Sequence, residues 1–166
     1  VVVEVRGGEV VDAGYLDALV AAGFNRLSLG MQSARPSVLA VLERRHTPGR
    51  VAEVVTAARS AGFGSINLDL IYGSPAETAS DWRESLTTAL ELAPEHVSAY
   101  SLIVEDGTRL ARRIRRGELP APDDDLHAEL YQLAEQLLTS AGLENYEISN
   151  WALPGQECQH NLAYWL

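Results

Sequence analysis

Four short runs of apolar, largely β-branched residues recur along the chain, and amphipathic patterns separate them. The runs cover residues 1–5, 26–30, 65–71 and 96–103. Each is as long as an ordinary strand and has glycine or proline nearby, which favours a strand over a buried helix. Because helical patterns lie between the runs, we expect strand–helix–strand units and therefore a parallel sheet with right-handed crossovers.

The helical patterns carry their own start signals. Asp12 stands before an apolar stripe as a helix N-cap, and Thr47 followed by Pro48 is typical of a cap with proline at the first helical position. Thr78 with Asp81 resembles a capping box in which the shorter aspartate replaces glutamate. These signals place one helix after each of the first three strands and support the α/β interpretation.

The pattern changes after the fourth run. A short helix over 108–116, a long one over 123–141 and one short strand over 145–149 follow. We therefore divide the chain into an α/β part with about four parallel strands, residues 1–104, and a helical extension, residues 105–166.

Composition narrows the class of protein. The chain has 166 residues and 18.0 kDa, enough for one domain but too little for a closed eight-stranded α/β barrel. The net charge of -10 argues against nucleic-acid binding, which depends on cations that neutralise phosphates. No apolar run approaches the length of a membrane span. We expect a globular protein without nucleic-acid partners or membrane spans.

The single cysteine, Cys158, limits the metal chemistry of the chain. One cysteine forms no disulfide within the chain and does not by itself hold a zinc or iron–sulfur site. The cytoplasm is the default compartment for such a chain. Both ends of the sequence fall inside apolar segments, so we expect a fragment of a longer protein.

Polar residues interrupt the predicted strands or follow them directly. Glu4 lies in the first run, Gln32 follows the second, and Asp69 lies in the middle of the third. Parallel α/β folds bind ligands at the carboxyl ends of their strands, so the three groups point to one cavity for an ammonium or hydroxyl ligand, such as an amino acid or ribose. The alternative is that Glu4 and Asp69 form structural ion pairs with arginines, for example Arg44.

Several longer motifs resemble those of the radical S-adenosylmethionine (SAM) enzymes. They are residues 26–33 with 44–46, residues 67–73 and residues 98–102. The branch that they resemble is that of oxygen-independent coproporphyrinogen III oxidase and, more closely, its haem-chaperone relatives of the HemW type. Residues 144–151 fit this branch, and 160–165 match the HNxxYW signature that separates the chaperones from the oxidases.

The resemblance implies a partial (β/α)6 barrel of radical SAM type, of which this chain supplies strands three to six. It also implies SAM contacts. Glu4 would accept from the methionine amino group, Arg44 would pair with its carboxylate, and Asp69 would bind the ribose hydroxyls. Gln32 would hold either end of SAM, and Ile103 would offer a backbone contact near the adenine.

The chain departs from the family pattern in several places, of which two concern the cluster ligands and the loop after the third run. The family's CxxxCxxC motif, which holds a [4Fe–4S] cluster, is absent, so the cluster ligands are missing from this chain. The family's Tyr-Gly-Leu-Pro stands here as Tyr72-Gly73-Ser74-Pro75, with Glu77 also unusual in the loop. The first departure predicts that the isolated chain has no radical chemistry of its own.

The HNxxYW signature implies a haem site. Its residues are His160, Asn161, Tyr164 and Trp165, and His160 is the expected haem ligand. The alternative is that the two aromatic residues pack on the barrel while His160 caps a loop. A basic cluster at 109–116 has two interpretations as well: a surface for propionates or an acidic partner, or a solvated helix face paired with nearby acidic residues.

Three functions follow from the resemblance. The first is a haem chaperone that binds haem, SAM and a [4Fe–4S] cluster in its full-length form and passes haem to respiratory-chain haem proteins. The second is oxidative decarboxylation of coproporphyrinogen III to protoporphyrinogen IX. The third is an inactive scaffold fragment. All three belong to porphyrin metabolism or derive from it, and all three are expected in the cytoplasm.

Overall fold

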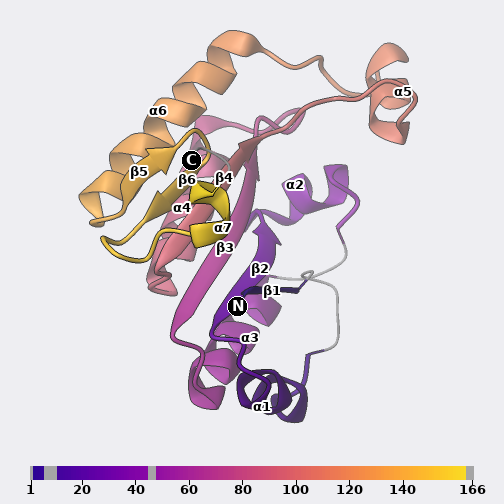
Figure 1. Ribbon diagram of the computed structural model, residues 1–166. Coiled ribbons are helices and arrows are strands. Elements are labelled where there is room, and N and C mark those ends of the chain that lie inside the picture. Colours follow the sequence, from indigo (N-terminus) through magenta and orange to yellow (C-terminus); the bar gives the residue numbers. More distant parts are fainter. Residues whose placement is uncertain (1, 6–10, 45–47, 164–166) are drawn as a thin grey trace.

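The computed structural model describes residues 2–5, 11–44 and 48–163. The elements are, in chain order, β1 (Val2–Val5), α1 (Ala13–Ala21), β2 (Arg26–Gln32), α2 (Pro36–Val41), α3 (Pro48–Ala61), β3 (Ser65–Tyr72), α4 (Ala79–Glu91), β4 (His96–Ser101), α5 (Arg109–Arg115), α6 (Asp124–Ser140), β5 (Glu144–Glu147), β6 (Asn150–Ala152) and α7 (Gln159–Leu162). Figure 1 shows their arrangement around one sheet.

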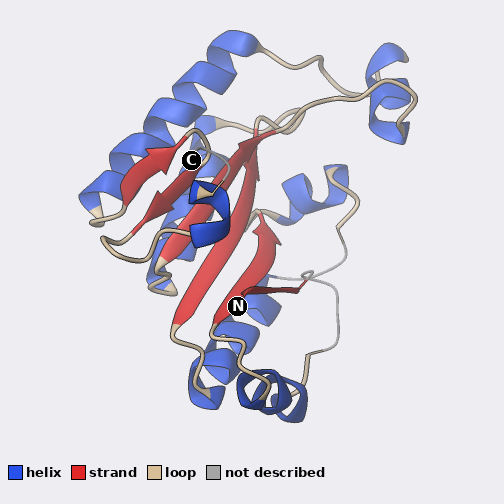
Figure 2. Cartoon of the chain, viewed as in Figure 1, coloured by secondary structure: helices blue, strands red, loops and turns tan. Residues whose placement is uncertain are grey.

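The sheet has the strand order β1-β2-β3-β4-β6-β5. β1 to β4 are parallel, whereas β6 pairs antiparallel with β4 and β5 pairs antiparallel with β6. The expected α/β fold with four parallel strands and an open sheet is therefore confirmed (Figure 2).

The end of the chain differs from the sequence prediction. The strand expected over 145–149 is present as β5, and a turn at residues 148 and 149 joins it to a second short strand, β6, which was not predicted. β6 was missed because it begins at Asn150 and ends before Pro154, too short a run for apolar alternation to be visible. The proposed division at residue 104 stays a prediction, although β6 extends the same sheet as β4.

Two of the predicted helix caps are present in the structure. The Asp12 carboxylate accepts from the Tyr15 amide at 2.7 Å. Thr78 and Asp81 form a reciprocal capping box, so the short aspartate side chain reaches the Thr78 amide. Thr47 lies outside the described residues.

One face of the sheet forms the hydrophobic core with the helices. Its strand residues alternate with the polar ones and are almost fully buried: Leu27, Leu29, Ile66, Leu68, Leu70, Val97 and Ala99. Helices α3, α4 and α6 cover this face with Val51, Val54, Val55, Ala58, Leu86, Ala89, Leu130 and Leu138, among others. The Trp82 indole of α4 donates to the Leu130 carbonyl of α6 at 2.9 Å, which joins the two helices. Among the described residues, no helix is long and apolar enough to cross a membrane.

The opposite face of the same strands is polar. In one row of neighbouring residues Glu4 lies beside Ser28, which lies beside Asn67, which lies beside His96. In the next row Asp69 lies beside Ser98. Helix α7 and the loop before it lie in front of this polar face, the inner face of the sheet, in Figure 1. The polar groups of the strands and residues 156–161 line one cavity.

Candidate functional site

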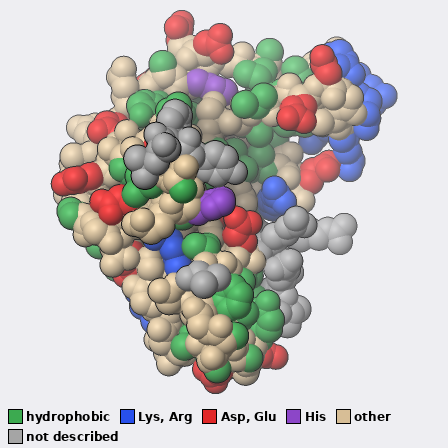
Figure 3. Space-filling model, in the orientation of Figure 1, with side chains coloured by type: hydrophobic (Ala, Val, Ile, Leu, Met, Phe, Trp, Pro, Cys, Tyr) green, Lys and Arg blue, Asp and Glu red, His purple; other side chains and the backbone are tan. Residues whose placement is uncertain are grey.

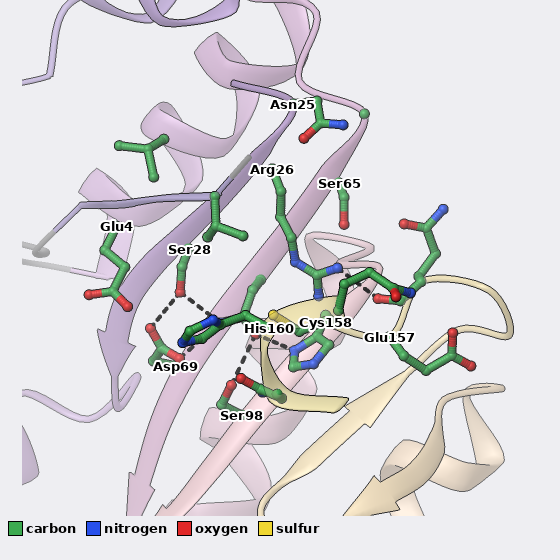
Figure 4. A pocket seen from close by; sticks show the side chains of 18 of the residues that line it. Glu4, Asn25, Arg26, Ser28, Ser65, Asp69, Ser98, Glu157, Cys158 and His160 are labelled. Atoms are coloured by element: carbon green, nitrogen blue, oxygen red, sulfur yellow. Dashed lines mark hydrogen bonds between the residues drawn. The ribbon is translucent and has the colours of Figure 1, made fainter. Parts of the chain in front are cut away.

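A cavity of ≈ 1030 Å³ lies between the inner face of β1–β4 and residues 156–161. The strands contribute Glu4, Arg26, Ser28, Ser65, Asn67, Asp69, His96, Ser98 and Tyr100, and the terminal segment contributes Gln156 to Asn161. Figure 4 shows His160 and Cys158 on one side of this cavity, with Ser28, Asp69 and Ser98 of the strands close by. The volume and the mixed lining are those of a ligand site.

Asp69 is the central acceptor on the strand side. Ser28 Oγ donates to Asp69 Oδ2 at 2.9 Å, and Asn67 Nδ2 donates to Asp69 Oδ1 at 2.8 Å. Burial raises the pKa of the Asp69 carboxyl above its usual value, although the bonds from Ser28 and Asn67 oppose this shift. A half-buried carboxylate with free lone pairs is suited to accept from further hydroxyl donors.

The contacts of Asp69 bear on two interpretations, a structural ion pair with an arginine and a ligand group. Among the described residues Asp69 bonds with a hydroxyl and an amide and forms no salt bridge with an arginine. The role of Asp69 as a ligand group stays a prediction.

A second set of bonds attaches the terminal segment to the sheet. The Tyr146 hydroxyl contacts His96 Nε2 at 2.6 Å, the Cys158 amide at 3.3 Å and Asn161 Nδ2 at 3.2 Å. His96 Nδ1 in turn contacts Asn67 Oδ1 at 2.7 Å. Burial, with a smaller effect from Arg26, lowers the pKa of His96 to about 3, so its ring is neutral at physiological pH. Tyr146 thus connects residues 156–161, the segment that contains His160 and Asn161 (the HN segment), to Asn67 and Asp69.

Arg26 provides a third attachment. Its Nη1 donates to the Gln156 carbonyl at 2.8 Å, while its buried Nη2 makes no hydrogen bond with the described residues. Arg26 is the one arginine among the described residues that line the cavity. The segment that carries His160 is therefore anchored at both ends, by Arg26 before it and by Tyr146 at its helix.

The structure brings some of the predicted site residues together and leaves others apart. Glu4, Asp69, His160 and Asn161 all line the cavity. Gln32, Arg44 and Ile103 do not line it; they lie toward or beyond the carboxyl ends of the strands. Tyr164 and Trp165 lie outside the described residues. The cavity thus joins the predicted haem segment with two of the five predicted SAM contacts.

Gln32 ends β2 in an unusual backbone conformation. Its φ is 65°, in the left-handed region, and the register between β2 and β3 shifts between Gly30 and Gln32. Ala76, in the loop after β3, also has a positive φ, of 66°. Strained non-glycine residues concentrate at ligand sites, and here two of them follow neighbouring parallel strands.

Arg44 and Ile103 are exposed. Arg44 follows α2, and its amide closes that helix by donating to the Leu39 carbonyl at 2.9 Å. Ile103 follows β4 and its side chain is 80% exposed, which fits the expectation that the backbone rather than the side chain contacts a ligand. Both residues are at the ends where ligands of parallel folds bind, with their side chains in solvent.

The loop after β3 is held by the unusual Glu77. Its Oε2 accepts from the Gly73 amide at 2.7 Å and from the Ser74 amide at 3.1 Å, while its buried Oε1 has no partner among the described residues. Burial raises the Glu77 pKa to about 7, against the effect of the two amides. Gly73 has a φ of 79°, and a Cβ there would lie 2.2 Å from His127 Nε2, so glycine is required at this position.

The basic cluster is a solvated surface with acidic partners in the structure. Arg109 pairs with Glu43 at 3.0 Å, Arg113 with Glu118 at 3.4 Å, and Arg115 with Asp106 at 3.5 Å. Figure 3 shows these basic side chains gathered over α5, away from the centre of the sheet. The cluster does not line the cavity, so the paired-surface interpretation is the one the contacts support.

Sequence reasoning missed most of the residues that build the cavity. Ser28, Asn67, His96, Ser98 and Tyr146 were read as parts of motifs or as scattered polar groups. Alternation was an available signal, because every second residue of residues 65–70 and 96–100 is polar or aromatic and the intervening ones are apolar. The roles of Tyr146 and Arg26 had no local signal, since their partners are distant in the sequence.

The residues at the cavity fit the three expected ligands, a [4Fe–4S] cluster, haem and SAM, to different degrees. Cys158 is the one cysteine of the chain, so these residues do not hold a [4Fe–4S] cluster. Among the described residues no group of three or more His, Cys, Asp or Glu side chains is arranged to hold a metal ion. Haem requires an axial donor, and His160 and Cys158 are residues of the cavity lining whose side chains are of that kind. A nucleoside with ribose hydroxyls fits the acceptors of Asp69.

Comparison with known proteins agrees with this fold. A heme chaperone HemW of Mycobacterium tuberculosis is 56% identical over 145 residues, which are 87% of this chain and 37% of that protein. Radical S-adenosyl methionine domain-containing protein 1 of Mus musculus, a mitochondrial protein, is 40% identical over 90% of this chain and 34% of its own length. The chain thus spans about a third of the length of these relatives.

A solved structure and a family model give the same result. The structure of coproporphyrinogen III oxidase (HemN) from Escherichia coli, a radical SAM enzyme, matches with a TM-score of 0.82 and 30% identity. The match covers 94% of this chain and 36% of that one. The model of the Radical SAM superfamily matches residues 2–89, the part that contains β1 to β3 and most of α4. The open parallel sheet, its polar inner face and these matches together show that the chain belongs to the radical SAM superfamily.

Proposed function

We propose that this chain is the part of a haem chaperone that supplies strands three to six of a radical SAM barrel and the beginning of its haem site. The observation that carries the proposal is the position of the HN segment, because His160 and Asn161 line the cavity on the inner face of the sheet. The names of the relatives, heme chaperone HemW among them, support it. A cytoplasmic location and haem donation to respiratory-chain haem proteins at the membrane belong to this proposal.

His160 is the proposed axial ligand of haem. It lies one residue inside α7, which Tyr146 holds against the sheet through Asn161 and the Cys158 amide. Cys158 is the second candidate, since its thiol lines the same cavity. Haem bound there would present its iron to the imidazole. Arg26, the arginine of the cavity lining, would pair with a haem propionate.

SAM is proposed to bind between the inner face and the carboxyl ends of β1 to β4. Asp69 would accept from the ribose hydroxyls, Glu4 from the methionine ammonium, and Gln32 would contact either end of the ligand. Arg44 and Ile103 would meet SAM from beyond the strand ends. The [4Fe–4S] cluster supplies electrons to SAM in this superfamily, and its ligands are residues that this chain does not contain.

Haem titration of the chain tests the proposal. We expect one Soret-absorbing haem per chain in the wild type and a loss of at least about 10-fold in affinity for His160→Ala, because a removed axial donor costs more than one decade of binding. Cys158→Ser should leave the spectrum unchanged if His160 is the ligand. His127→Gln is the matched control, since His127 contacts Gly73 and Ser101 rather than the cavity. Absence of haem binding in the wild type would remove the proposal.

Oxidative decarboxylation of coproporphyrinogen III is the second candidate. The likeness to the Escherichia coli oxidase at a TM-score of 0.82 supports it. The HN segment argues for the chaperone instead. Anaerobic conversion of coproporphyrinogen III by the complete protein, without stoichiometric haem binding, would favour the oxidase. A chain that binds neither haem nor SAM would leave the inactive scaffold fragment.

A further inference from the structure

The Tyr146 hydroxyl lies at the centre of the bonds between the HN segment and the sheet. It contacts His96 on one side and the Cys158 amide and Asn161 on the other. Its ring also meets the His96 ring edge-on, with centroids 5.5 Å apart. Burial raises the pKa of Tyr146, so the hydroxyl keeps its proton and has one bond to donate.

The direction of each hydrogen bond in this series is fixed by the group at its end, the Asp69 carboxylate. An ionised Asp69 only accepts, so Asn67 donates to it through Nδ2, and Ser28 Oγ also receives from the same amide nitrogen at 2.7 Å. The Asn67 Oδ1 atom must then accept, as its bond from Ser98 Oγ confirms at 3.3 Å. The amide of Asn67 therefore has one orientation.

The orientation of Asn67 decides the tautomer of His96. Because Asn67 Oδ1 accepts, His96 Nδ1 carries the single proton of the neutral ring. His96 Nε2 then accepts, and Tyr146 must donate to it. The remaining lone pairs of the Tyr146 oxygen accept from the Cys158 amide and from Asn161 Nδ2. All donors in the series from Asn161 to Asp69 point toward the carboxylate.

We propose that this directed series, Asn161–Tyr146–His96–Asn67–Asp69, couples the two ends of the cavity, so that a ribose diol bound at Asp69 raises the affinity for haem at His160. The inference rests on the proposed function. Tyr146 is a positioning residue in it, because it does not line the cavity, and His96 acts through its bonds to Asn67 and Tyr146. Burial favours the protonated Asp69 carboxyl, which is able to donate and so to reverse Asn67. A diol that donates to the ionised carboxylate holds Asn67 and the His96 tautomer in the orientation that orders the segment carrying His160. Less ordering entropy is then lost when haem binds.

The coupling must be reciprocal. If SAM raises the haem affinity by some factor, haem raises the SAM affinity by the same factor. Coupling free energies of this kind usually correspond to about 5-fold or more, which titration resolves. The factor depends on Tyr146, since its hydroxyl bonds both to His96 of the sheet series and to Asn161 of α7.

The experiment is haem titration of the wild-type chain with and without saturating SAM, followed by Soret absorbance. Methionine is the ligand control, because it lacks the ribose. We expect SAM, but not methionine, to raise the haem affinity about 5-fold or more. Tyr146→Phe should bind both ligands with a coupling factor near one and a shifted Soret or electron paramagnetic resonance spectrum, since the imidazole of His160 is less well oriented.

Tyr131→Phe is the matched control for the tyrosine change. Tyr131 packs on Trp151 and does not line the cavity, so the coupling factor should stay that of the wild type. Binding of both ligands with a wild-type coupling factor of one would overturn the inference and leave the proposed function intact. Failure of the wild type to bind haem or SAM, each measured separately, would remove the proposed function and the inference with it. Equal coupling in wild type and Tyr146→Phe would also overturn it.

Discussion

The two faces of the parallel strands are built by alternate residues of the same four segments, yet they serve different ends. On the helix-covered face Leu27, Leu68 and Val97 are fully buried among other apolar side chains. On the inner face their neighbours Ser28, Asp69 and Ser98 form hydrogen bonds around a cavity. Because a strand turns successive side chains to opposite faces, one segment supplies stability and chemistry at once.

The difference between the two faces predicts which substitutions alter stability and which alter binding. Apolar burial on the outer face accounts for the stability of the fold, at roughly 25 cal/mol per Å² of apolar surface removed from water. The inner face contributes bonds whose net worth is about 1 kcal/mol each, because water competes for the same groups. Changes on the outer face should therefore alter unfolding, and changes on the inner face should alter binding.

The largest effect is expected for Leu68→Ala. Leu68 is 0% exposed, and its truncation leaves a cavity that the packed helices do not fill. We expect the free energy of unfolding in urea to fall by about 3 kcal/mol. A loss below about 1 kcal/mol would mean that the outer face does not dominate stability, and the comparison between the faces would fail.

Glu77→Gln should come next, and its effect depends on pH. The pKa of Glu77 is raised in the folded state from 4.5 to about 7, so the folded chain holds a proton that the unfolded chain has lost between these values. The free energy of unfolding therefore decreases as pH rises through this window. The glutamine keeps the acceptor for the Gly73 and Ser74 amides without the charge.

We expect Glu77→Gln to stabilise the chain by about 1 to 3 kcal/mol at pH 8 and to change stability little at pH 5. Urea unfolding at both pH values measures the difference. An equal effect at the two pH values would show that the buried charge is not its cause. Glu53→Gln, at an exposed ion pair with Arg50, is the matched control and should show no such pH dependence.

Asp69→Asn separates binding from stability on the inner face. The change keeps the shape of the side chain, and burial already disfavours the charged carboxylate. We expect the free energy of unfolding at pH 8 to change by less than about 1 kcal/mol. SAM binding should fall by at least about 10-fold, because the ribose hydroxyls lose a charged acceptor. A large loss of stability with unchanged SAM binding would reverse the assignment of this face.

The smallest effect is expected for Arg109→Ala. Arg109 pairs with Glu43, and both side chains are half or more exposed. Exposed ion pairs contribute little to the stability of the fold. We therefore expect a change in unfolding free energy below about 0.5 kcal/mol and no change in haem binding. Weaker haem binding would restore the interpretation of the α5 cluster as a propionate surface.

The sequence predicted the fold better than the site. Leu68-Asp69-Leu70 already identified a strand with one polar position, and Thr78 with Asp81 marked a helix start, because both signals are local. Asp69 was predicted as a site residue and lines the cavity. Tyr146 was not predicted, because its role arises from partners 50 residues before it and 15 residues after it. β6 escaped prediction because the strand is short and its pairing with β4 is non-local.

The bond between Arg26 and Gln156 has a consequence for the order in which the molecule folds. It joins residues 130 positions apart, whereas the parallel strands pair with neighbours that follow after one or two helices. Contacts of such long range form after the entropy of closing the loop between them has been lost, so they come late on the folding pathway. The terminal segment should then dock on a sheet that is already assembled. Partial unfolding should release it first, opening the cavity while the helix-covered core stays intact.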